Sequence, residues 1–430
     1  MTVTQLTFLT ALSMMGSGII MLPTKLAEVG TFSIVSWLVT ATGSTALAYA
    51  FAKCGMLSRK SGGMGGYAEY AFGKSGSFIA NTLYAFSLLI ANIAMAISAV
   101  GYASVLFNWQ TSPLQTGLLT VALLWICSAV NFRGARLTGL VSNMTAWCAI
   151  IPVAFLSIAG WFWFDPALYL ASWNPNNLPT FDAVRSSITM TLWAFLGLEA
   201  ACVNADAVEN PEKNIPKAVL GATISVALIY ILSTNMIAGI VDNATLVQST
   251  APFGLVYSMM FNDTVGVIVT ALMILACVGS LMSWQFTIAR VFKLSADEGY
   301  FPRFFRLITR EGTPLVGLLV ITGVQTLLAL GTISPSLYRQ FNVMVDLAVV
   351  TNLVPYLLSM GAVATILREE NVRGRVATIT MIAAGIGFCY SVYATYASGL
   401  AATLFGVLAS LVAWVVYQTT VTRVMVRKTS

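Results

Sequence analysis

The sequence predicts an all-α integral membrane protein with about twelve transmembrane helices. Of its 430 residues, 58% are hydrophobic and 9% are charged, whereas a soluble domain carries roughly a quarter of its residues as Asp, Glu, Lys and Arg. The apolar residues form continuous runs of about 20 residues, the length a helix needs to cross a bilayer. Because unpaired backbone groups are costly in lipid, and the runs lack the alternation of barrel strands, we expect helices.

The expected spans follow one another along the whole chain. They lie near residues 4–28, 33–54, 76–107, 115–131, 140–164, 183–205, 216–241, 264–290, 314–333, 341–366, 376–396 and 400–421. All of the 22 basic residues except Lys25, Arg185 and Arg339 fall on one side of these spans. The positive-inside rule predicts that this side, with both termini, is cytoplasmic.

The residue inventory argues against several other functions. The chain has no histidine, which removes His metal sites and His general bases, and its six cysteines are scattered without metal-ligand spacing or a disulfide framework. We therefore expect no cofactor, no metal and no enzymatic activity. The basic residues are spread in short clusters between apolar runs, which disfavours a nucleic-acid partner. A channel would need a repeated pore-lining filter, and the sequence has none.

Two expected spans are interrupted where a helix should be continuous. The first contains Gly16-Ser17-Gly18, and the sixth contains Gly197 followed closely by the carboxylate of Glu199. Paired interruptions of this kind are typical of a transporter binding site. The alternative is that membrane helices tolerate glycine at packing faces.

The spacing of the two interruptions predicts an inverted repeat. They are five spans apart, and an odd offset reverses orientation in the membrane. Residues 1–165 would form the first repeat and residues 181–370 the second, with 371–430 forming two additional helices. The whole chain, residues 1–430, would then be a single transporter domain.

Two acidic residues, Glu199 and Asp346, fall well inside expected spans. A charge at the bilayer centre costs roughly 2.5–3.5 kcal/mol on insertion scales and is by default functional. No Lys or Arg is expected at comparable depth, so the partner would be the ammonium group of a substrate or a proton. The alternatives are a structural pairing of Glu199 at a packing face and a position of Asp346 nearer the interface.

Aromatic and backbone groups could complete a site around these carboxylates. Trp193, Trp284, Tyr84 and Trp414 are candidates for cation–π contacts of about 0.5–2 kcal/mol each, although any one of them could equally face lipid or pack. The second half of the first span should begin near Gly18, where free N–H groups attract a carboxylate. Together these features describe a receptor for an amino acid or a derived amine.

A glycine-rich segment, residues 61–73, separates the second and third spans. It follows no strand and lacks the Lys-Ser/Thr of a phosphate loop, so nucleotide binding is not expected. We interpret it as a flexible cytoplasmic gate in which Glu69 attracts cationic solutes. The alternative is that Glu69 balances the charges of Lys74 and Arg59.

The sequence resembles the amino acid–polyamine–organocation superfamily, in its basic amino acid/polyamine antiporter branch. The resemblance covers nearly the whole chain and is carried by residues 14–30, 58–76, 190–199, 208–212 and 297–302. It implies a LeuT-like fold of five plus five inverted helices with two extra helices, in the cell inner membrane. It also implies obligatory exchange without a sodium requirement.

The resemblance further implies roles for individual residues. A substrate carboxylate would meet the first break, an amine would meet the sixth span, and two indoles would form the walls. The implied substrate-binding residues are Gly16, Ser17, Gly18, Ile19, Tyr84, Asn92, Trp193, Glu199, Trp284 and Asp346. The implied gating or pathway residues are Cys54, Glu69, Trp414 and Tyr417. Asp346 is a departure, because close relatives have an amide there; a second anion could grip the far ammonium of a diamine or bind a proton.

The function implied is exchange of a cationic amino acid, ornithine, for its decarboxylated diamine, putrescine, by alternating access. One alternative is proton-coupled uptake of the diamine, with Glu199 or Asp346 as the titrating group. The others are exchange of a different pair, lysine with cadaverine or arginine with agmatine. The expected partners are these small molecules, protons in the uptake alternative, the lipid bilayer, and a second copy of the chain if the protein is a homodimer.

Overall fold

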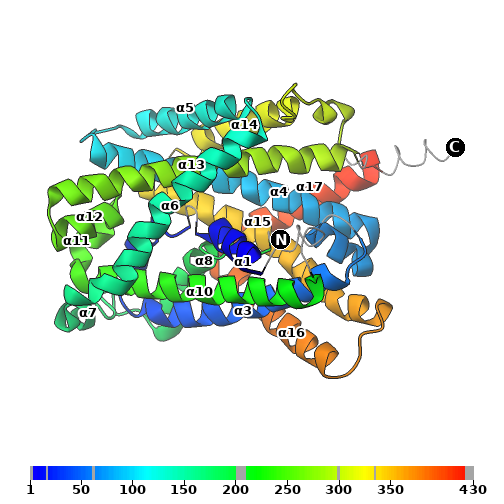
Figure 1. The fold of residues 1–430 in the computed structure, drawn as a ribbon, viewed down its shortest axis with the longest axis horizontal. Helices are drawn as coiled ribbons and strands as arrows, with labels where there is room; N and C mark the ends of the chain where they lie inside the picture. Colours follow the sequence, from blue (N-terminus) through cyan, green and yellow to red (C-terminus); the bar gives the residue numbers. More distant parts are fainter. Residues whose placement is uncertain are drawn as a thin grey trace.

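Most of the long helices lie side by side, roughly along the long axis of the molecule, and the helix Ala135–Ala159 crosses them obliquely (Figure 1). The computed structural model describes residues 3–15, 18–60, 63–199, 210–297, 301–333 and 336–421. Among these residues, nine helices are long and apolar enough to cross a membrane. They are α3 (Ser33–Leu57), α4 (Met64–Leu106), α5 (Pro113–Asn131), α6 (Ala135–Ala159), α10 (Pro211–Ile240), α13 (Asp263–Asp297), α15 (Leu337–Glu369), α16 (Arg375–Ala397) and α17 (Leu400–Val416). The prediction of an all-helical membrane fold is confirmed.

Four shorter helices fall at the remaining expected spans. They are α14 (Leu315–Gly331), which is apolar, and the half-helices α1 (Val3–Met14), α2 (Leu22–Ala27) and α8 (Thr180–Trp193). The first and sixth spans are thus interrupted, as the sequence predicts. The total of about twelve spans stays a prediction, because the second half of the sixth span lies outside the described residues.

Three short helices were not expected from the sequence. These are α7 (Pro166–Ala171), α11 (Asn243–Gln248) and α12 (Pro252–Met260), at the left-hand end of Figure 1. Local signals explain two of the starts: Asp165 accepts a hydrogen bond from the Ala167 N–H (2.8 Å), and Asp242 accepts one from the Thr245 N–H (2.8 Å). An N-cap carboxylate of this kind satisfies a free amide of the first turn.

The glycine-rich segment before the third span differs from the prediction. The expected span began at residue 76, but α4 already begins at Met64 and bends at Gly73 (φ 63°) instead of ending there. Glycine reaches positive φ at no steric cost, so the chain can change direction and resume the helix. The expected start of the third span near residue 76 is therefore wrong, and the role of this segment as a gate stays a prediction.

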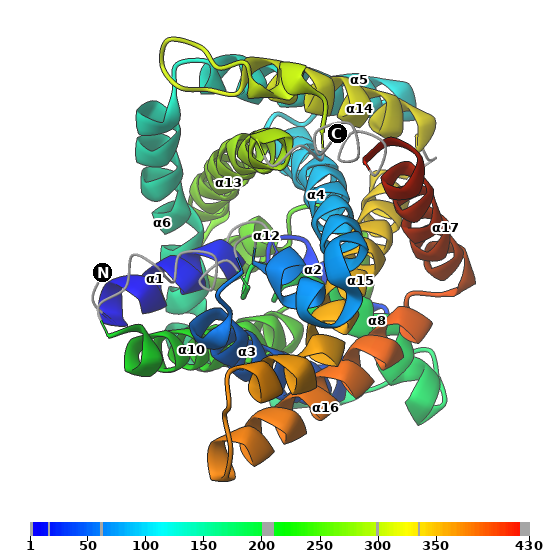
Figure 2. The ribbon, with the colours of Figure 1, turned by 90° about the vertical axis from the view of Figure 1, so that its right-hand side faces the viewer.

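Helix α4 lies at the centre of the molecule. In its most apolar stretch 89% of the residues are buried, against 22% in the peripheral helix α17. The end view shows α5 and α14 beyond α4 and α13 on one side, and α16 beyond α3 on the other (Figure 2). Large apolar side chains remain exposed on the outer helices, for example Ile158 and Leu400. These side chains would face lipid.

Hydroxyl pairs join α3 to the half-helix α8. Ser36 Oγ lies 2.7 Å from Ser187 Oγ, and one turn further along both helices Thr40 Oγ1 lies 2.6 Å from Thr191 Oγ1. Hydroxyl bonds between membrane helices average about 0.6 kcal/mol each. The ladder therefore helps to fix α8 against α3 as far as its last turn, where the interruption begins.

Candidate functional site

The first interruption lies between α1, which ends at Met14, and α2, which begins at Leu22. The sequence predicted that the second half-helix begins near Gly18, but residues 18–21 form turns. The reason is Pro23, which lies in the first turn of α2. Its ring has no N–H and its fixed φ suits that position, so it sets the helix start four residues later. Gly16 and Ser17, two of the predicted site residues, lie outside the described residues.

Buried tyrosines satisfy carbonyl groups that the interruption of α1 leaves free. The Tyr230 hydroxyl donates to the Met14 carbonyl oxygen (2.8 Å), and the Tyr102 hydroxyl donates to the Ile20 carbonyl oxygen (2.8 Å). Both tyrosines are 0% exposed. Unsatisfied carbonyls at this depth would cost several kcal/mol each, so these hydroxyls allow the helix to stop inside the membrane.

The second interruption begins after Trp193, where α8 gives way to turns over residues 194–199. Gly197 has φ +108°, and a Cβ added there would lie 2.7 Å from the Ser13 carbonyl oxygen. A Cβ added to Gly18 would lie 3.0 Å from the Ala194 Cα. Each interruption is therefore packed against the backbone of the other, at a distance that only glycine permits.

A small cavity lies between the two interruptions. It is lined by Ser13, Met14, Gly18, Leu88, Ala91, Met95, Trp193, Leu196, Gly197 and Trp284. Its volume of about 30 Å³ has room for roughly two water molecules. Pockets that enclose organic ligands are commonly about 300–1,000 Å³. The structure thus brings Gly18, Trp193 and Trp284 together as predicted, in a nearly closed state.

The Glu199 carboxylate lies just beyond the turn that contains Gly197. Its side chain is 2% exposed. One oxygen, Oε2, accepts hydrogen bonds from the Tyr356 hydroxyl (2.7 Å) and the Gly197 N–H (3.1 Å). The Tyr84 hydroxyl lies beside the same carboxylate. The other oxygen, Oε1, is buried and has no hydrogen-bond partner among the described residues.

A second unpaired polar atom belongs to the cavity wall. The indole Nε1 of Trp193 is buried and donates to no described group. Leaving a buried polar group unpaired costs about 1–3 kcal/mol. Among the described residues, the Trp193 donor and the Glu199 Oε1 acceptor therefore both lack a partner. A molecule that carries both an ammonium and a carboxylate could satisfy both.

Asn92 takes part in a buried polar network, and its side chain is not among those that line the cavity. Its Nδ2 donates to Gln285 Oε1 (2.7 Å), and Gln285 Nε2 donates to Gln325 Oε1 (2.7 Å) and Thr322 Oγ1 (2.9 Å). The network ties α4, α13 and α14 together. Gln285 directly follows Trp284, so the network holds the turn of α13 that carries this indole.

Sequence reasoning missed the two glutamines and Tyr356. Each lies inside an expected span: Gln285 in 264–290, Gln325 in 314–333 and Tyr356 in 341–366. Polar amides inside apolar runs are costly unless paired, so the two glutamines could have been recognised in the sequence as candidates for a buried hydrogen bond. Tyr356 carries a weaker signal, because a tyrosine after Pro355 in a span could equally pack against lipid.

Asp346 does not line the cavity. It lies on α15, partly buried, and near enough to Lys25 of α2 for their charges to interact. Lys25 also pairs with Glu28 through a 2.6 Å contact between Nζ and Oε2. Asp346 therefore has a basic neighbour at the end of the site opposite to Glu199. No result tests its predicted role as a second amine-binding group.

Cys54 lies near the end of α3, and Glu69 lies near the start of α4. Cys54 is buried one turn after Phe51, whose ring packs on Tyr356 with centroids 5.0 Å apart. Glu69 pairs with Lys60, at 3.4 Å between Oε1 and Nζ. Its partner in the structure is thus neither of the two basic residues considered from the sequence.

Trp414 and Tyr417 lie on the last helix, away from the cavity. The Tyr417 ring packs on Phe78 with centroids 5.6 Å apart. The Trp414 side chain is 48% exposed on the outer surface of α17. A direct contact of Trp414 with a solute in the central cavity is not possible in this state.

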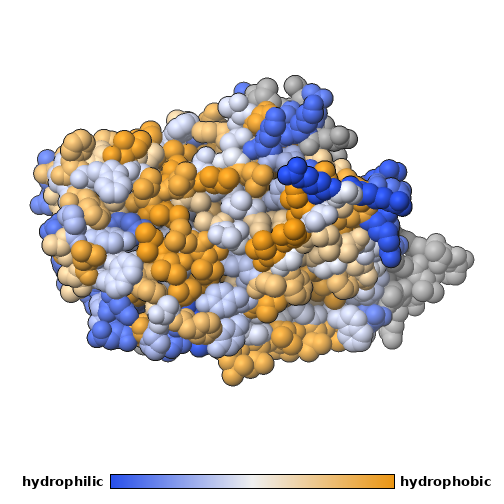
Figure 3. Space-filling view, turned by 90° about the horizontal axis from the view of Figure 1, so that it is seen from below, coloured by the Kyte–Doolittle hydropathy of each residue, from blue (hydrophilic) through white to orange (hydrophobic). Residues whose placement is uncertain are grey.

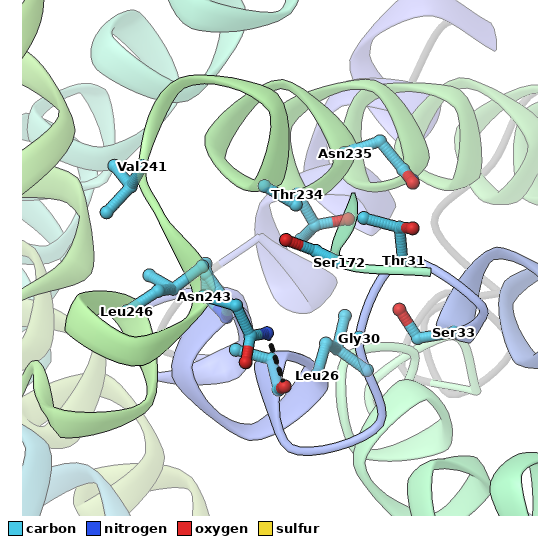
Figure 4. A pocket seen from close by; sticks show the side chains of 13 residues that line it. Leu26, Gly30, Thr31, Ser33, Ser172, Thr234, Asn235, Val241, Asn243 and Leu246 are labelled. Carbon is cyan, nitrogen blue, oxygen red and sulfur yellow. Dashed lines mark hydrogen bonds between the residues drawn. The ribbon is translucent and has the colours of Figure 1, made fainter. Parts of the chain in front are cut away.

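A second, smaller cavity of about 10 Å³ lies at the C-terminal end of α2 (Figure 4). Polar side chains around it hold that end of the half-helix. Asn243 Nδ2 donates to the Ala27 carbonyl oxygen (2.7 Å), and Thr24 Oγ1 donates to the Ser249 carbonyl oxygen (2.8 Å). Its size leaves no room for an amine, so we assign it a structural role.

The contact between the two interruptions predicts the effect of Gly197→Ala. Positive φ costs an alanine about 1–3 kcal/mol, and the new Cβ would overlap the Ser13 carbonyl oxygen. We expect the thermal unfolding midpoint of the purified protein in detergent to fall by several degrees. Gly323→Ala in α14 is the matched control, because nothing lies within 4 Å of its added Cβ. Equal midpoints for the two variants would contradict the packing described above.

Comparison with known proteins places the chain among amino acid and amine transporters. Residues 1–424 match the amino acid permease family. The chain is 62% identical over 415 residues to the putrescine transporter PotE of Haemophilus influenzae, covering 96% of this chain and 95% of the relative. It is 61% identical over 417 residues to the putrescine transporter PotE of Escherichia coli K12, covering 97% and 95%.

A more distant relative has a related name. The cadaverine/lysine antiporter of Escherichia coli K12 is 31% identical over 388 residues, covering 88% of this chain and 86% of the relative. The family match extends over both interrupted spans and the helices that enclose the cavity. The chain therefore belongs to the amino acid permease family of the amino acid–polyamine–organocation superfamily.

Proposed function

We propose that this protein exchanges ornithine for putrescine across the membrane. The observation that carries the proposal is the buried Glu199 carboxylate, whose Oε1 has no partner among the described residues. Glu199 lies two residues after Gly197, which lines a cavity together with Trp193 and Trp284. An ammonium group satisfies the Oε1 oxygen, and indole faces add cation–π attraction. The identity of 61–62% to putrescine transporters over nearly the full length supports a diamine as one substrate.

The two proposed substrates share one ammonium-bearing end and differ at the other. The shared end would bind at Glu199. The carboxylate of ornithine would accept a hydrogen bond from the free Trp193 Nε1 and approach the interruption at Gly18, while putrescine would leave that donor unused. At neutral pH ornithine carries about +1 charge and putrescine about +2. Exchange of one for the other moves about one charge, worth about 2.3 kcal/mol per 100 mV.

The transport cycle would proceed by alternating access. Residues 1–165 and 181–370 would form the two inverted repeats, and each repeat would begin with an interrupted span. The protein would lie in the cell inner membrane, with its basic end and both termini in the cytoplasm. The half-helices would move against α4, α13 and α14, which the Asn92–Gln285–Gln325 network ties together. The cavity of about 30 Å³ must enlarge to admit either solute.

A second candidate function is proton-coupled uptake of the diamine. The buried carboxylate of Glu199 favours it, because a carboxylate in an apolar site can carry a proton in place of an amine. Exchange requires a substrate on the far side of the membrane, whereas uptake requires a pH gradient. The resemblance to a cadaverine/lysine antiporter makes that pair the next to test.

Reconstituted protein distinguishes these functions. We expect labelled ornithine to enter liposomes preloaded with putrescine and not empty ones, because each inward step needs a return step with cargo. Glu199→Gln should reduce the exchange rate at least tenfold, since the amide offers no charge to an ammonium. Glu311→Gln, in an exposed loop, is the matched control and should exchange at the original rate. Uptake into empty liposomes driven by an imposed pH gradient would contradict exchange and support proton symport.

The hydrogen bond from Tyr356 to Glu199 gives a further prediction. Tyr356→Phe keeps the ring against Phe51 but removes the donor, and bonds to charged groups contribute about 1.5–3 kcal/mol. We expect the KM for putrescine to change by roughly tenfold or more while the protein remains folded. Tyr390→Phe removes a buried hydroxyl that bonds Thr40 outside the site, and its KM should stay within about twofold. Similar KM values in both variants would exclude a role for Tyr356 in substrate binding.

A further inference from the structure

A large groove opens on the outer surface between three helices, far from the central cavity. It is lined by Leu38, Ala41, Thr42, Thr45, Ala46 and Tyr49 of α3, Leu220 of α10, and Ile379, Ile382, Ala383 and Ile386 of α16. Its volume of about 590 Å³ is in the range of organic ligand sites, whereas the central cavity has about 30 Å³. Several lining residues are exposed, including Leu38 (58%) and Ile382 (58%).

The groove lies in the apolar belt of the molecule. Helices α3, α10 and α16 lie along the lower side of Figure 1, so they face the viewer in Figure 3. Apolar side chains cover the middle of this face, and hydrophilic side chains gather towards its ends (Figure 3). A groove with aliphatic walls at this depth would be filled by hydrocarbon in a bilayer, because water has almost no polar partner there.

Three cations lie at one end of the groove, one from each helix. Lys53 is one turn beyond Tyr49, Lys217 one turn before Leu220, and Arg375 one turn before Ile379. Residues three or four apart lie on the same helix face, so each cation extends the strip of its helix that lines the groove. All three lie towards the basic end of the molecule, where α3 ends and α10 and α16 begin.

These cations are available to a ligand. The Lys53 Nζ lies 5.6 Å from the centroid of the Tyr49 ring, which places it directly over the groove wall. Lys217 and Arg375 are exposed. In the part of the chain that the structure describes, none of the three forms an ion pair with a carboxylate. An anion at this point would therefore meet three positive charges without displacing a carboxylate of the described residues.

We propose that this groove binds one anionic phospholipid, with an acyl chain between α3, α10 and α16 and its phosphate at Lys53, Lys217 and Arg375. Basic pockets between membrane helices at the cytoplasmic surface suit such headgroups. A second copy of the chain fits less well. A two-fold axis along the membrane normal would bring the three cations against the same three cations of the partner.

The groove adjoins the helices that carry the interruptions. Helix α10 contacts α1, and both α3 and α16 contact α8. A lipid held between α10, α3 and α16 therefore touches the elements against which both half-helices pack. The proposal concerns binding and does not depend on which solute the central cavity takes.

The test measures lipid binding to the purified full-length protein in detergent by native mass spectrometry. Phosphatidylglycerol is the anionic probe and phosphatidylethanolamine the zwitterionic control. A cation near the membrane surface contributes about fivefold in affinity, so the triple variant Lys53→Gln, Lys217→Gln, Arg375→Gln should bind phosphatidylglycerol on the order of 100-fold more weakly. Its affinity for phosphatidylethanolamine should change much less.

A matched control removes the same charge elsewhere. Arg133→Gln, Arg136→Gln, Arg310→Gln takes three exposed cations from the same end of the molecule and should keep phosphatidylglycerol affinity within about threefold. Ala383→Trp, which fills the groove, should weaken both lipids. The proposal would be overturned if the two triple variants lost phosphatidylglycerol affinity equally. It would also be overturned if Ala383→Trp converted a protein dimer to monomers and left the amount of bound lipid unchanged. If the triple variant unfolds, Lys53→Gln alone should still show the fivefold loss.

Discussion

The two interrupted helices must satisfy their own backbone inside the membrane, and the centre of the structure is arranged around this constraint. Lipid offers no hydrogen bonds, so each free carbonyl or amide at an interruption needs a partner from the protein. The Tyr230 hydroxyl donates to the end of α1, and the Tyr102 hydroxyl donates to Ile20 within the interruption. After α8, the Glu199 carboxylate accepts a hydrogen bond from the Gly197 amide. Because Gly18 and Gly197 lack Cβ atoms, the two interruptions can also pack directly against each other. The cavity lies where they meet.

The same constraint connects stability to function. Glu199 Oε2 accepts hydrogen bonds from the Gly197 N–H and the Tyr356 hydroxyl, and Oε1 has no partner among the described residues. A carboxylate with both oxygens satisfied would be a purely structural anchor, and one with neither satisfied would be too costly to bury. Under the proposed function, this arrangement would retain affinity for a cation while the protein is empty. Glu199 would then act both as a partner of the interrupted backbone and as a binding group.

The sequence predicts the helices and both interruptions because these depend on local signals. Apolar length marks the spans, and Gly18, Gly197 and Glu199 are unusual residues for a membrane interior. The tyrosines that cap α1 could not be predicted, because a tyrosine in an apolar run looks the same whether its hydroxyl reaches a carbonyl or an interface. Likewise the start of α4 at Met64 depends on Gly73 bending a helix rather than ending it, which only tertiary packing decides.

The helices on the two sides of the cavity differ in how tightly they are held together. On one side the amide network of Asn92, Gln285 and Gln325 joins α4, α13 and α14 through bonds of 2.7–3.0 Å and makes that wall rigid. On the other side α3, α10 and α16 leave a groove of about 590 Å³ instead of packing tightly. Dense interiors resist small displacements, whereas a groove filled by a lipid can change shape at little cost. If the groove holds a lipid as proposed, the half-helices would move more easily towards α3, α10 and α16 than towards the polar network.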